Sequence, residues 1–255
     1  MNTSMQPTAK LSAPDWCFLK SGVDPAAHYV RLKSLGFAGV EMVAPANRAA
    51  ARAAGLEIIN LSGPGMQHGL NRRANHATLL PQIRDCIAEA AANSIGQVIV
   101  FSGNRDGQAD AQGQAACIEA LRLLATDAVK AGVTLVLEML NGFDHADYQA
   151  DRSAFGFAVI DAVKSPAVRV LYDIYHMARM GDDPLRDIIG HLHVISHLHC
   201  AESPRRTMPK ATGEIAYRDL YQRLTAAGYC GYWGLEFIPG SDVYGELAAA
   251  AAVFA

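Results

Sequence analysis

Short apolar runs alternate with helix-like segments along nearly the whole chain, and this alternation restricts the fold more than any other feature. Runs of strand length occur at 15–18, 39–43, 56–61, 97–101, 133–137, 168–172, 194–198 and 232–235. The segments between them carry apolar residues at helical spacing or are rich in alanine, as at 115–131. About eight strand-then-helix units follow one another, which is the number in a (β/α)₈ barrel. The pattern therefore predicts an α/β protein with the TIM-barrel architecture.

Chain length and glycine positions agree with a single barrel. A chain of 255 residues with 51% hydrophobic residues has the typical length of this fold, so we expect one domain over 1–255. A glycine stands shortly before several predicted strands, where it would end the preceding helix, at Gly36, Gly55, Gly132 and Gly228. Residues 1–13 are polar and precede the first predicted strand, and we expect them to form a flexible lead.

Charge and cysteine content exclude several kinds of partner and compartment. The net charge of -3 offers no basic surface for a phosphate backbone, so we expect no nucleic acid partner. No apolar run approaches the ~20 residues of a membrane helix, and the N-terminus lacks the apolar core of a signal peptide. The five cysteines contain no C-x-x-C pair, which predicts free thiols in a reducing compartment. We expect a cytoplasmic protein without a membrane partner, a monomer or a homo-oligomer, that acts on a small molecule.

The segment 168–206 holds more chemically useful side chains than any other part of the chain. It is typical of a strand, a helix and a second strand. Asp173 and His176 follow the first of these strands, and His199 and Glu202 lie at and after the end of the second. Parallel strands that are joined by a helix have their carboxyl ends at the same edge of the sheet. These side chains should therefore converge.

Other predicted strands end in side chains of the same kind. Glu138 ends the fifth strand and Glu236 ends the eighth, so that together with Asp173 and His199 four successive strands each carry one. An unpaired charge behind an apolar strand is unfavourable, which favours a functional cluster over unrelated helix caps and loop ion pairs. Three carboxylates and an imidazole suit Mn²⁺, Mg²⁺ or Co²⁺, with Zn²⁺ as an alternative.

Several polar residues near strand ends are weaker candidates. His68, in the loop after the third strand, and Glu202 are candidates for contact with a substrate, and Glu41 lies toward the end of the second strand. His197 shares a strand face with the ligand histidine and could orient it from behind. His193 lies on the same face and is expected to be a hydrogen-bonded core residue.

Two further features carry no expected function. The glycines at 63, 65 and 69 have the wrong spacing for a dinucleotide loop and no helix opens there, so we expect no nucleotide cofactor. His145 has nothing in its surroundings to distinguish it from a surface histidine.

With these residues in place, the chain resembles the xylose isomerase-like barrels, and within them the hydroxypyruvate isomerase and ketose 3-epimerase branches. The segments that carry the resemblance are L-V-L-E-M-L-N at 135–141, L-Y-D-I-Y-H-M at 171–177, S-H-L-H at 196–199, G-E-I at 213–215 and G-Y-W-G-L-E-F-I-P at 231–239. The resemblance extends over nearly the whole chain and is strongest after Leu135.

This resemblance implies a metal site and the residues that act in it. The residues that match the family's ligands for one divalent metal are Glu138, Asp173, His199 and Glu236. The two glutamates among them would also move protons as the catalytic residues. The family holds the substrate's oxygens with a histidine and an arginine, which here match His176 and either Arg206 or Arg205.

Departures from the family pattern leave the substrate open. Hydroxypyruvate isomerases commonly have glutamine where this chain has His199, whereas the 3-epimerases have histidine. Arg205 has the spacing of the epimerases, and Arg206 fits the spacing of the hydroxypyruvate isomerases better. The Arg-His-Glu-Pro run of the latter enzymes appears here as Arg-Thr-Met-Pro at 206–209. The segments Y-H-M, G-E-I and G-L-E-F-I-P still favour the hydroxypyruvate isomerase branch.

The activity that the resemblance implies is aldose–ketose isomerisation through an enediolate, on a small hydroxy-keto acid or sugar in carbohydrate metabolism. Hydroxypyruvate is the first choice of substrate, and ketose 3-epimerisation is the alternative. A polyol dehydratase of the same fold would use the same residues. An apurinic endonuclease is disfavoured, because it needs a cluster of zinc ions and no Asp-x-His pair lies between His199 and Glu236 to extend the ligand set.

Overall fold

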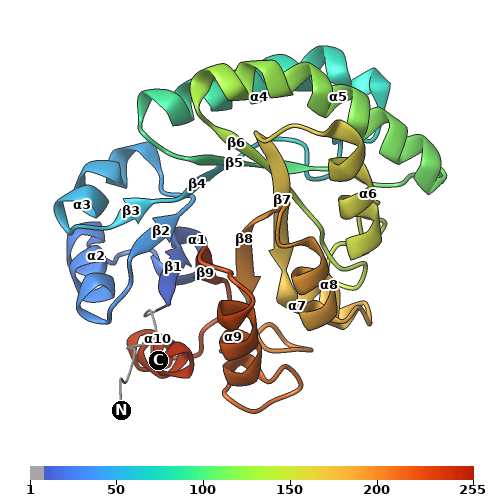
Figure 1. Ribbon diagram of the computed structural model, residues 1–255. Helices are drawn as coiled ribbons and strands as arrows, with labels where there is room; N and C mark the ends of the chain where they lie inside the picture. The colour runs from blue at the N-terminus through green and yellow to red at the C-terminus, as the bar shows by residue number, and fades with distance from the viewer. Residues whose placement is uncertain (1–8) are drawn as a thin grey trace.

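Nine strands form one sheet in the computed structural model, which describes residues 9–255 (Figure 1). They are β1 (Lys10–Pro14), β2 (Gly39–Glu41), β3 (Glu57–Ile58), β4 (Asn60–Ser62), β5 (Gln97–Phe101), β6 (Thr134–Glu138), β7 (Val168–Asp173), β8 (Ile195–Cys200) and β9 (Tyr232–Leu235). Their order in the sheet is β3-β2-β1-β9-β8-β7-β6-β5-β4, and every neighbouring pair is parallel. The predicted (β/α)₈ barrel is confirmed.

The two edge strands of this order are parts of one chain segment. β3 pairs with β2, and β4 pairs with β5, while Ile59 between them donates its N–H to the carbonyl of Val40 at 3.0 Å. The segment predicted as the third strand, 56–61, therefore touches both ends of the sheet. This segment closes the sheet into a barrel with eight strand positions.

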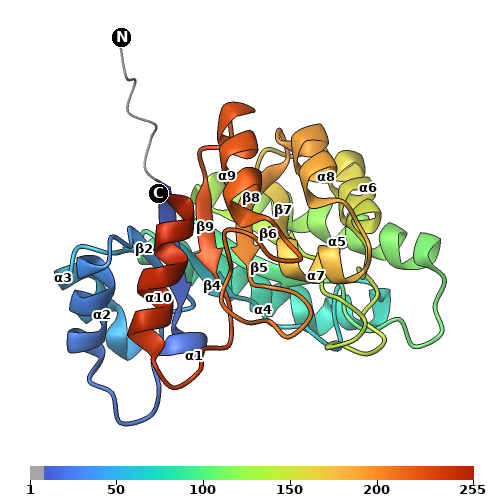
Figure 2. The same cartoon turned by 90° about the horizontal axis from the view of Figure 1, so that it is seen from below.

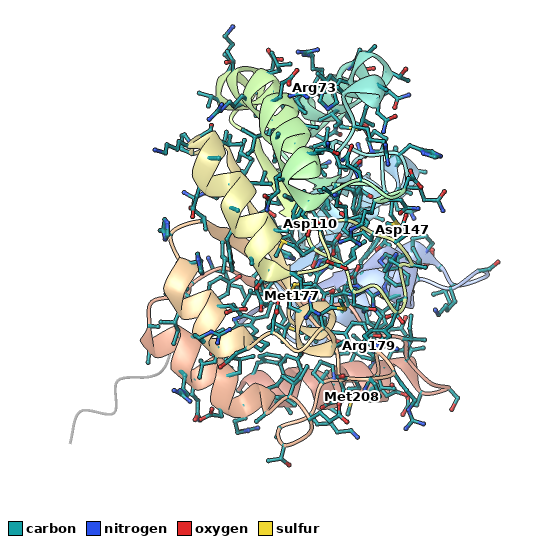
Figure 3. The ribbon with its side chains drawn as sticks, turned by 90° about the vertical axis from the view of Figure 1, so that its right-hand side faces the viewer. Arg73, Asp110, Asp147, Met177, Arg179 and Met208 are labelled. Carbon is teal, nitrogen blue, oxygen red and sulfur yellow. The ribbon has the colours of Figure 1, made fainter. Side chains whose placement is uncertain are left out.

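Helices cover the outside of the barrel (Figures 1 and 2). They are α1 (Asp15–Phe18), α2 (Pro25–Ser34), α3 (Arg48–Ala53), α4 (Arg73–Ala92), α5 (Asp110–Ala131), α6 (Ser153–Val163), α7 (Ile174–Arg179), α8 (Pro184–His191), α9 (Tyr217–Ala226) and α10 (Val243–Ala251), with 3-10 turns at Pro45–Asn47 and Ala252–Phe254. A side view shows α5, α6 and α8, in green, yellow and orange, along the outer face (Figure 3). Between residues 9 and 255, none of these helices is both long and apolar enough to cross a membrane.

The last helix closes the ring of helices against the first ones. α10 lies beside α2 in both views of the ribbon (Figures 1 and 2), and the imidazole Nδ1 of His28 lies 2.9 Å from the hydroxyl of Tyr244. α2 itself begins where Asp24 accepts hydrogen bonds from the backbone N–H groups of its first turn and Pro25 occupies the first helical position. Cap and proline thus explain why the helix starts there.

Two predictions for the first eighteen residues are wrong. Residues 10–13, expected in a flexible lead, belong to β1, and 15–18, expected as a strand, form α1. β1 pairs with both β2 and β9, so the barrel is incomplete without it. The apolar pattern does not reveal this strand because its central residue, Ser12, is polar. The Ser12 hydroxyl donates a hydrogen bond to Glu41 inside the barrel at 2.7 Å. Residues 1–8 of the expected lead lie outside the described residues.

The prediction for His193 is also wrong. β8 begins only at Ile195, and His193 is exposed in the turn before it. Its carbonyl accepts a hydrogen bond from the guanidinium of Arg169 at 2.7 Å. The strand expected from the alternating histidines is therefore too long at its amino end.

Candidate active site

The carboxyl ends of β6, β7, β8 and β9 bring together four side chains that the sequence marks as metal ligands. Glu138, Asp173, His199 and Glu236 each offer one ligand atom to a group whose atoms all lie within 4.8 Å of one another. All four residues are buried, with at most 5% of their surface exposed. The strands that carry them are consecutive in the sheet, and the register places Asp173 opposite His199. Strand order and register thus account for the cluster.

The imidazole of His199 lies between carboxylates on both of its sides. Its Nδ1 is 3.2 Å from Glu138 Oε1 and 2.9 Å from Glu236 Oε2, and its Nε2 is 2.9 Å from Glu41 Oε2. Asp173 completes the group from β7, where its Oδ1 accepts the backbone N–H of His176 at 2.9 Å and so caps the amino end of α7. The short helix after β7 follows from this cap.

Burial perturbs the acidity of the three carboxyl groups in the cluster. It raises the pKa of Glu138 to about 7, although contact with His199 acts in the opposite direction. Burial also raises the pKa of Asp173 to about 6, against the charge of Arg206. For Glu236 burial again acts to raise the pKa, but the charges of His199 and Arg206 outweigh it and lower the pKa to about 2. The protein's own cations therefore compensate only one of the three carboxylates fully.

The donor set fits a divalent cation. Three carboxylates and one imidazole are hard oxygen and nitrogen ligands, which suit Mn²⁺, Mg²⁺ or Co²⁺ more than a soft thiolate site does. A dication among them would offset the desolvation of the buried carboxylates that raises the pKa values of Glu138 and Asp173. The position of the cluster, at the carboxyl ends of the strands, is also where this fold places its active sites.

A cavity of about 330 Å³ opens beside the cluster. It is lined by Trp16, Met42, Ser62, Met66, Phe101, Glu138, Leu140, His145, His176, Arg206 and Glu236. The lining residues are of two kinds: some carry carboxylates, imidazoles or a guanidinium, and Met42, Met66, Phe101 and Leu140 are apolar. The cavity thus offers charged groups for a reacting centre and apolar contacts for the rest of a ligand.

His176 lines this cavity and carries a buried ring nitrogen without a hydrogen-bond partner in the described part of the chain. Its Nδ1 accepts the backbone N–H of Asn141 at 3.1 Å, so the proton of the neutral ring belongs on Nε2. Burial, followed by the charge of Arg206, holds the pKa of His176 well below its usual range, which keeps the ring neutral. Among the residues that the structure describes, Nε2 has no hydrogen-bond partner, and it lies 3.6 Å from Asp173 Oδ2. A ligand oxygen in the cavity would satisfy this buried group.

Arg206 also reaches the cavity, and it is held there by aromatic rings. Its guanidinium carbon lies 5.2 Å from the ring centre of Trp16 and 5.6 Å from that of Tyr175. Its Nη2 is 2.5 Å from Glu236 Oε2. Arg205, the other predicted arginine, is exposed on the loop. Of the two adjacent arginines, Arg206 therefore lines the cavity and Arg205 does not.

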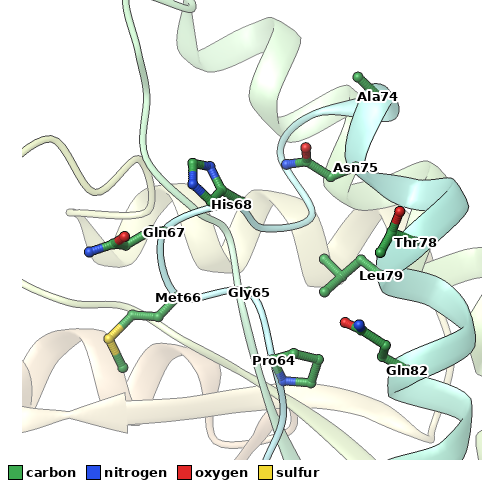
Figure 4. Close-up of a pocket in the computed structure, with 10 residues that line it drawn as sticks. All are labelled: Pro64, Gly65, Met66, Gln67, His68, Ala74, Asn75, Thr78, Leu79 and Gln82. Carbon is green, nitrogen blue, oxygen red and sulfur yellow. The ribbon is translucent and has the colours of Figure 1, made fainter.

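Two predicted substrate contacts, Glu202 and His68, lie outside this cavity. Glu202 is buried, its carboxylate accepts the backbone N–H of Ile215 at 3.2 Å, and its backbone pairs with Thr207, so it supports the loop after β8. His68 lines a separate open hollow of about 470 Å³ between the segment 64–68 and α4 (Figure 4). In that view Met66 points away from α4.

His145 and Trp16 line the cavity and contact predicted site residues, but neither is predicted as a site residue from the sequence. His145, expected at the surface, lines the cavity, and its ring packs edge-on against His176 with 5.3 Å between the ring centres. Trp16, placed in a strand by its apolar neighbours, stands on α1 and donates its indole N–H to Glu236 Oε1 at 2.9 Å. The spacing of Trp16 from Glu236 in the sequence, 220 residues, gives no signal for this contact.

The position of Trp16 predicts an optical signal for binding. The chain has two tryptophans, Trp16 in the cavity wall and Trp233 in the core. Titration with Mn²⁺ is expected to quench fluorescence, because a paramagnetic ion beside Glu236 would lie close to the indole. Trp16→Phe is expected to abolish this response, and Trp233→Phe is expected to retain it. An undiminished response in Trp16→Phe would contradict the placement.

Comparisons with known proteins agree with this fold. A family model described as xylose isomerase-like TIM barrel matches residues 30–252. A putative hydroxypyruvate isomerase of Streptomyces coelicolor is 33% identical over 163 residues, which cover 61% of this chain and 58% of that protein. The hydroxypyruvate isomerase of Escherichia coli is 32% identical over 133 residues, covering 52% of this chain and 51% of that enzyme. The matched regions thus span little more than half of these two relatives.

A solved structure matches over a larger share of the chain. The crystal structure of an AP endonuclease, family 2, from Brucella melitensis has a TM-score of 0.86 and covers 96% of this chain and 98% of its own. The two sequences are 22% identical, so this likeness concerns the fold alone.

Proposed function

The chain belongs to the xylose isomerase-like TIM barrel family, and on this premise we propose that it is a metal-dependent isomerase of small α-hydroxy carbonyl compounds, with hydroxypyruvate as the first substrate class. The observation that carries the proposal is the cavity wall in which Glu138 and Glu236, from the non-adjacent strands β6 and β9, flank one space together with His176 and Arg206. The hydroxypyruvate isomerases among the relatives support the same substrate class.

One divalent ion would be held by Glu138, Asp173, His199 and Glu236. When bound, it would supply positive charge for substrate oxygens that become negative during the reaction. These four ligands are buried, and burial raises the pKa values of Glu138 and Asp173. The positive charge of a bound ion would stabilise both carboxyl groups in their ionised form.

Isomerisation moves a proton between adjacent carbons, and Glu138 is the better-placed base. Its Oε1 faces His199, and the residue lines the cavity, so that its Oε2 would be the oxygen that meets the substrate. Both oxygens of Glu236 are engaged, Oε1 by the indole of Trp16 and Oε2 by Arg206. We assign the removal of the carbon-bound proton to Glu138, which would later release it to solvent, and the return of a proton to Glu236, which is ionised at rest and would first take that proton from solvent.

His176 and Arg206 would orient the substrate. The free Nε2–H of His176 would donate to the carbonyl oxygen and thereby favour negative charge on it. Arg206 has five N–H donors, and those that do not contact Glu236 remain for the carboxylate of a hydroxy-keto acid. A neutral ketose offers no partner for this charge, and for that reason we place a keto acid first.

Ketose 3-epimerisation is the second candidate. Two observations favour it: a histidine stands at position 199, and the cavity of about 330 Å³ exceeds the needs of a three-carbon acid. The same glutamates would then act on one carbon from its two faces.

Solvent exchange with a panel of substrates tests the proposal. The purified protein with added Mn²⁺ is incubated in D₂O with hydroxypyruvate, a ketohexose or a cyclic polyol, and deuterium in the carbon skeleton is measured by NMR. We expect incorporation next to the carbonyl of hydroxypyruvate. Faster exchange at C3 of the ketohexose would favour the epimerase, and water loss from the polyol without exchange would favour a dehydratase. No turnover of any of the three would refute the proposal.

Removal of one ligand tests the metal site itself. Asp173→Asn is expected to lower the affinity for Mn²⁺ by at least about tenfold, because it replaces a charged oxygen ligand by a neutral amide. Titration calorimetry of the substrate-free protein measures the affinity, and metal analysis measures the content as purified. Asp183→Asn, which alters an exposed cap of α8, is the matched control and should bind as the wild type does. Equal affinities of Asp173→Asn and wild type would contradict the assignment.

A further inference from the structure

Glu41 lies inside the barrel on the far side of His199 from Glu138 and Glu236. Its side chain is fully buried and accepts hydrogen bonds from the hydroxyl of Ser12 at 2.7 Å and the amide of Asn60 at 2.6 Å. Its Oε2 is also 2.9 Å from His199 Nε2. Glu41 belongs to β2, and these three partners come from β1, β4 and β8, so the carboxylate is fixed from several strands at once.

The two nitrogens of His199 thus face carboxylates with different surroundings. Nδ1 faces the cluster at Glu138 and Glu236, whereas Nε2 faces Glu41 alone at hydrogen-bond distance. An imidazole that binds a metal ion through one nitrogen is neutral and carries its single proton on the other nitrogen. If that proton is donated from Nε2 to Glu41, the lone pair of Nδ1 points into the cluster and is available to a cation.

The strand beside this pair leaves room for it. Gly234 of β9 stands opposite both Ser12 and His199 in the sheet register. A Cβ atom at this position would lie 2.4 Å from Glu41 Oε1 and 2.7 Å from His199 Cδ2, which is closer than such atoms can approach. Glycine is therefore required for the carboxylate and the imidazole to meet as they do.

We propose that Glu41 is a positioning residue for the metal site. By accepting the Nε2 proton of His199 it fixes the tautomer and the orientation of the ring, and so raises the affinity of the four ligands for a divalent ion. The inference rests on the proposed function, because it presumes that the cluster binds metal. It assigns no contact between Glu41 and the substrate.

A competing interpretation makes Glu41 a metal ligand. Glu41, His197 and His199 also offer ligand atoms within 4.8 Å of one another. His197 Nε2 lies 3.0 Å from Glu41 Oε2, and its Nδ1 has no hydrogen-bond partner in the described part of the chain. However, both oxygens of Glu41 already accept hydrogen bonds from neutral donors, Ser12 and Asn60. An ion bound to Glu41 would have to displace these donors. The geometry therefore favours the positioning role.

A double-mutant cycle on the substrate-free protein separates the roles. Glu41→Leu is expected to weaken Mn²⁺ binding about 10- to 100-fold, the usual effect of losing a partner behind a ligand. In the His199→Gln background the same substitution should change the affinity by less than about threefold, because residues that act through one contact are not additive. Calorimetry gives the affinity and the stoichiometry, and the visible spectrum of bound Co²⁺ reports the ligand geometry, which Glu41→Leu should alter.

Controls and contrary results are defined by the same measurements. Glu57→Leu makes the same change at an exposed position of β3 and should bind Mn²⁺ as the wild type does.

Should Glu41→Leu fail to fold, Glu41→Gln enters the same cycle. It keeps an acceptor for His199 without the charge, and a smaller, still non-additive loss of Mn²⁺ affinity is expected. Equal losses in both backgrounds, or an unchanged affinity, would overturn the inference. A second bound ion that disappears with Glu41 would overturn it in favour of the competing interpretation. Absence of metal from the wild type would instead refute the proposed function.

Discussion

Glu138→Gln is expected to slow the exchange of a carbon-bound substrate proton with solvent by about 10²- to 10⁴-fold, the range that general acid–base catalysis contributes. The amide cannot accept the proton, but it keeps the size of the side chain and one oxygen toward His199. The measurement is deuterium incorporation into hydroxypyruvate at a Mn²⁺ concentration that saturates the variant. Saturation separates the proton-transfer defect from the weaker metal binding that the same substitution causes.

Two further variants define what this result means. Glu236→Gln should also lose exchange beyond its loss of metal, because we assign the return of the proton to this residue. Glu202→Gln makes the same change in a buried carboxylate that supports the loop after β8, outside the cavity, and should exchange at the wild-type rate. If Glu138→Gln and Glu236→Gln both exchanged at the wild-type rate with metal bound, neither glutamate would be a proton-transfer group.

Most of the barrel could be predicted because its strands are apolar on both faces. The strands 97–101 and 232–235 have the predicted bounds. β1 could not be predicted from apolar residues, because it is polar at its centre. Its central Ser12 faces the polar interior beneath the site, so the segment lacks the continuous apolar run by which the other strands are recognised.

The convergence of the four predicted ligands follows from topology. Each stands at the carboxyl end of a strand, and parallel strands that follow one another in the sheet bring those ends together. What surrounds the ligands depends on contacts across the barrel. Glu41 was visible as a strand end, but it meets His199 across 158 residues of sequence and from a strand that is not a neighbour of β8.

The expectation that polar residues after strand ends lie in one cavity does not hold for Glu202 and His68. The loop after β8 turns back on itself through the backbone pair of Glu202 and Thr207, which directs the carboxylate to Ile215. The loop after β4 places His68 at the open hollow that this loop and α4 line together (Figure 4). Long loops fold by their own hydrogen bonds, which periodicity does not reveal.

Arg206→Met is expected to raise KM for hydroxypyruvate far more than KM for any neutral ketose that the enzyme accepts. Arg206 is largely buried between two aromatic rings, so its pairing with a substrate carboxylate would be desolvated. Removing one partner of such a pair weakens binding by about 2 to 5 kcal/mol. Arg206 also contacts Glu236, and therefore kcat should fall for every substrate. The dependence of KM on the substrate's carboxylate is what isolates the binding role.

The adjacent arginine provides the matched control. Arg205→Met removes the same charge one residue earlier, where the side chain is exposed, and should leave KM for hydroxypyruvate within about twofold, as exposed charges contribute little. Arg206→Lys keeps the charge without the planar fork and should recover part of the loss. If neither Arg205→Met nor Arg206→Met affected hydroxypyruvate while a neutral ketose proved the better substrate, the carboxylate-binding role would be refuted. The cavity, which is lined by apolar residues as well as by the glutamates, would then be assigned to the 3-epimerase reaction.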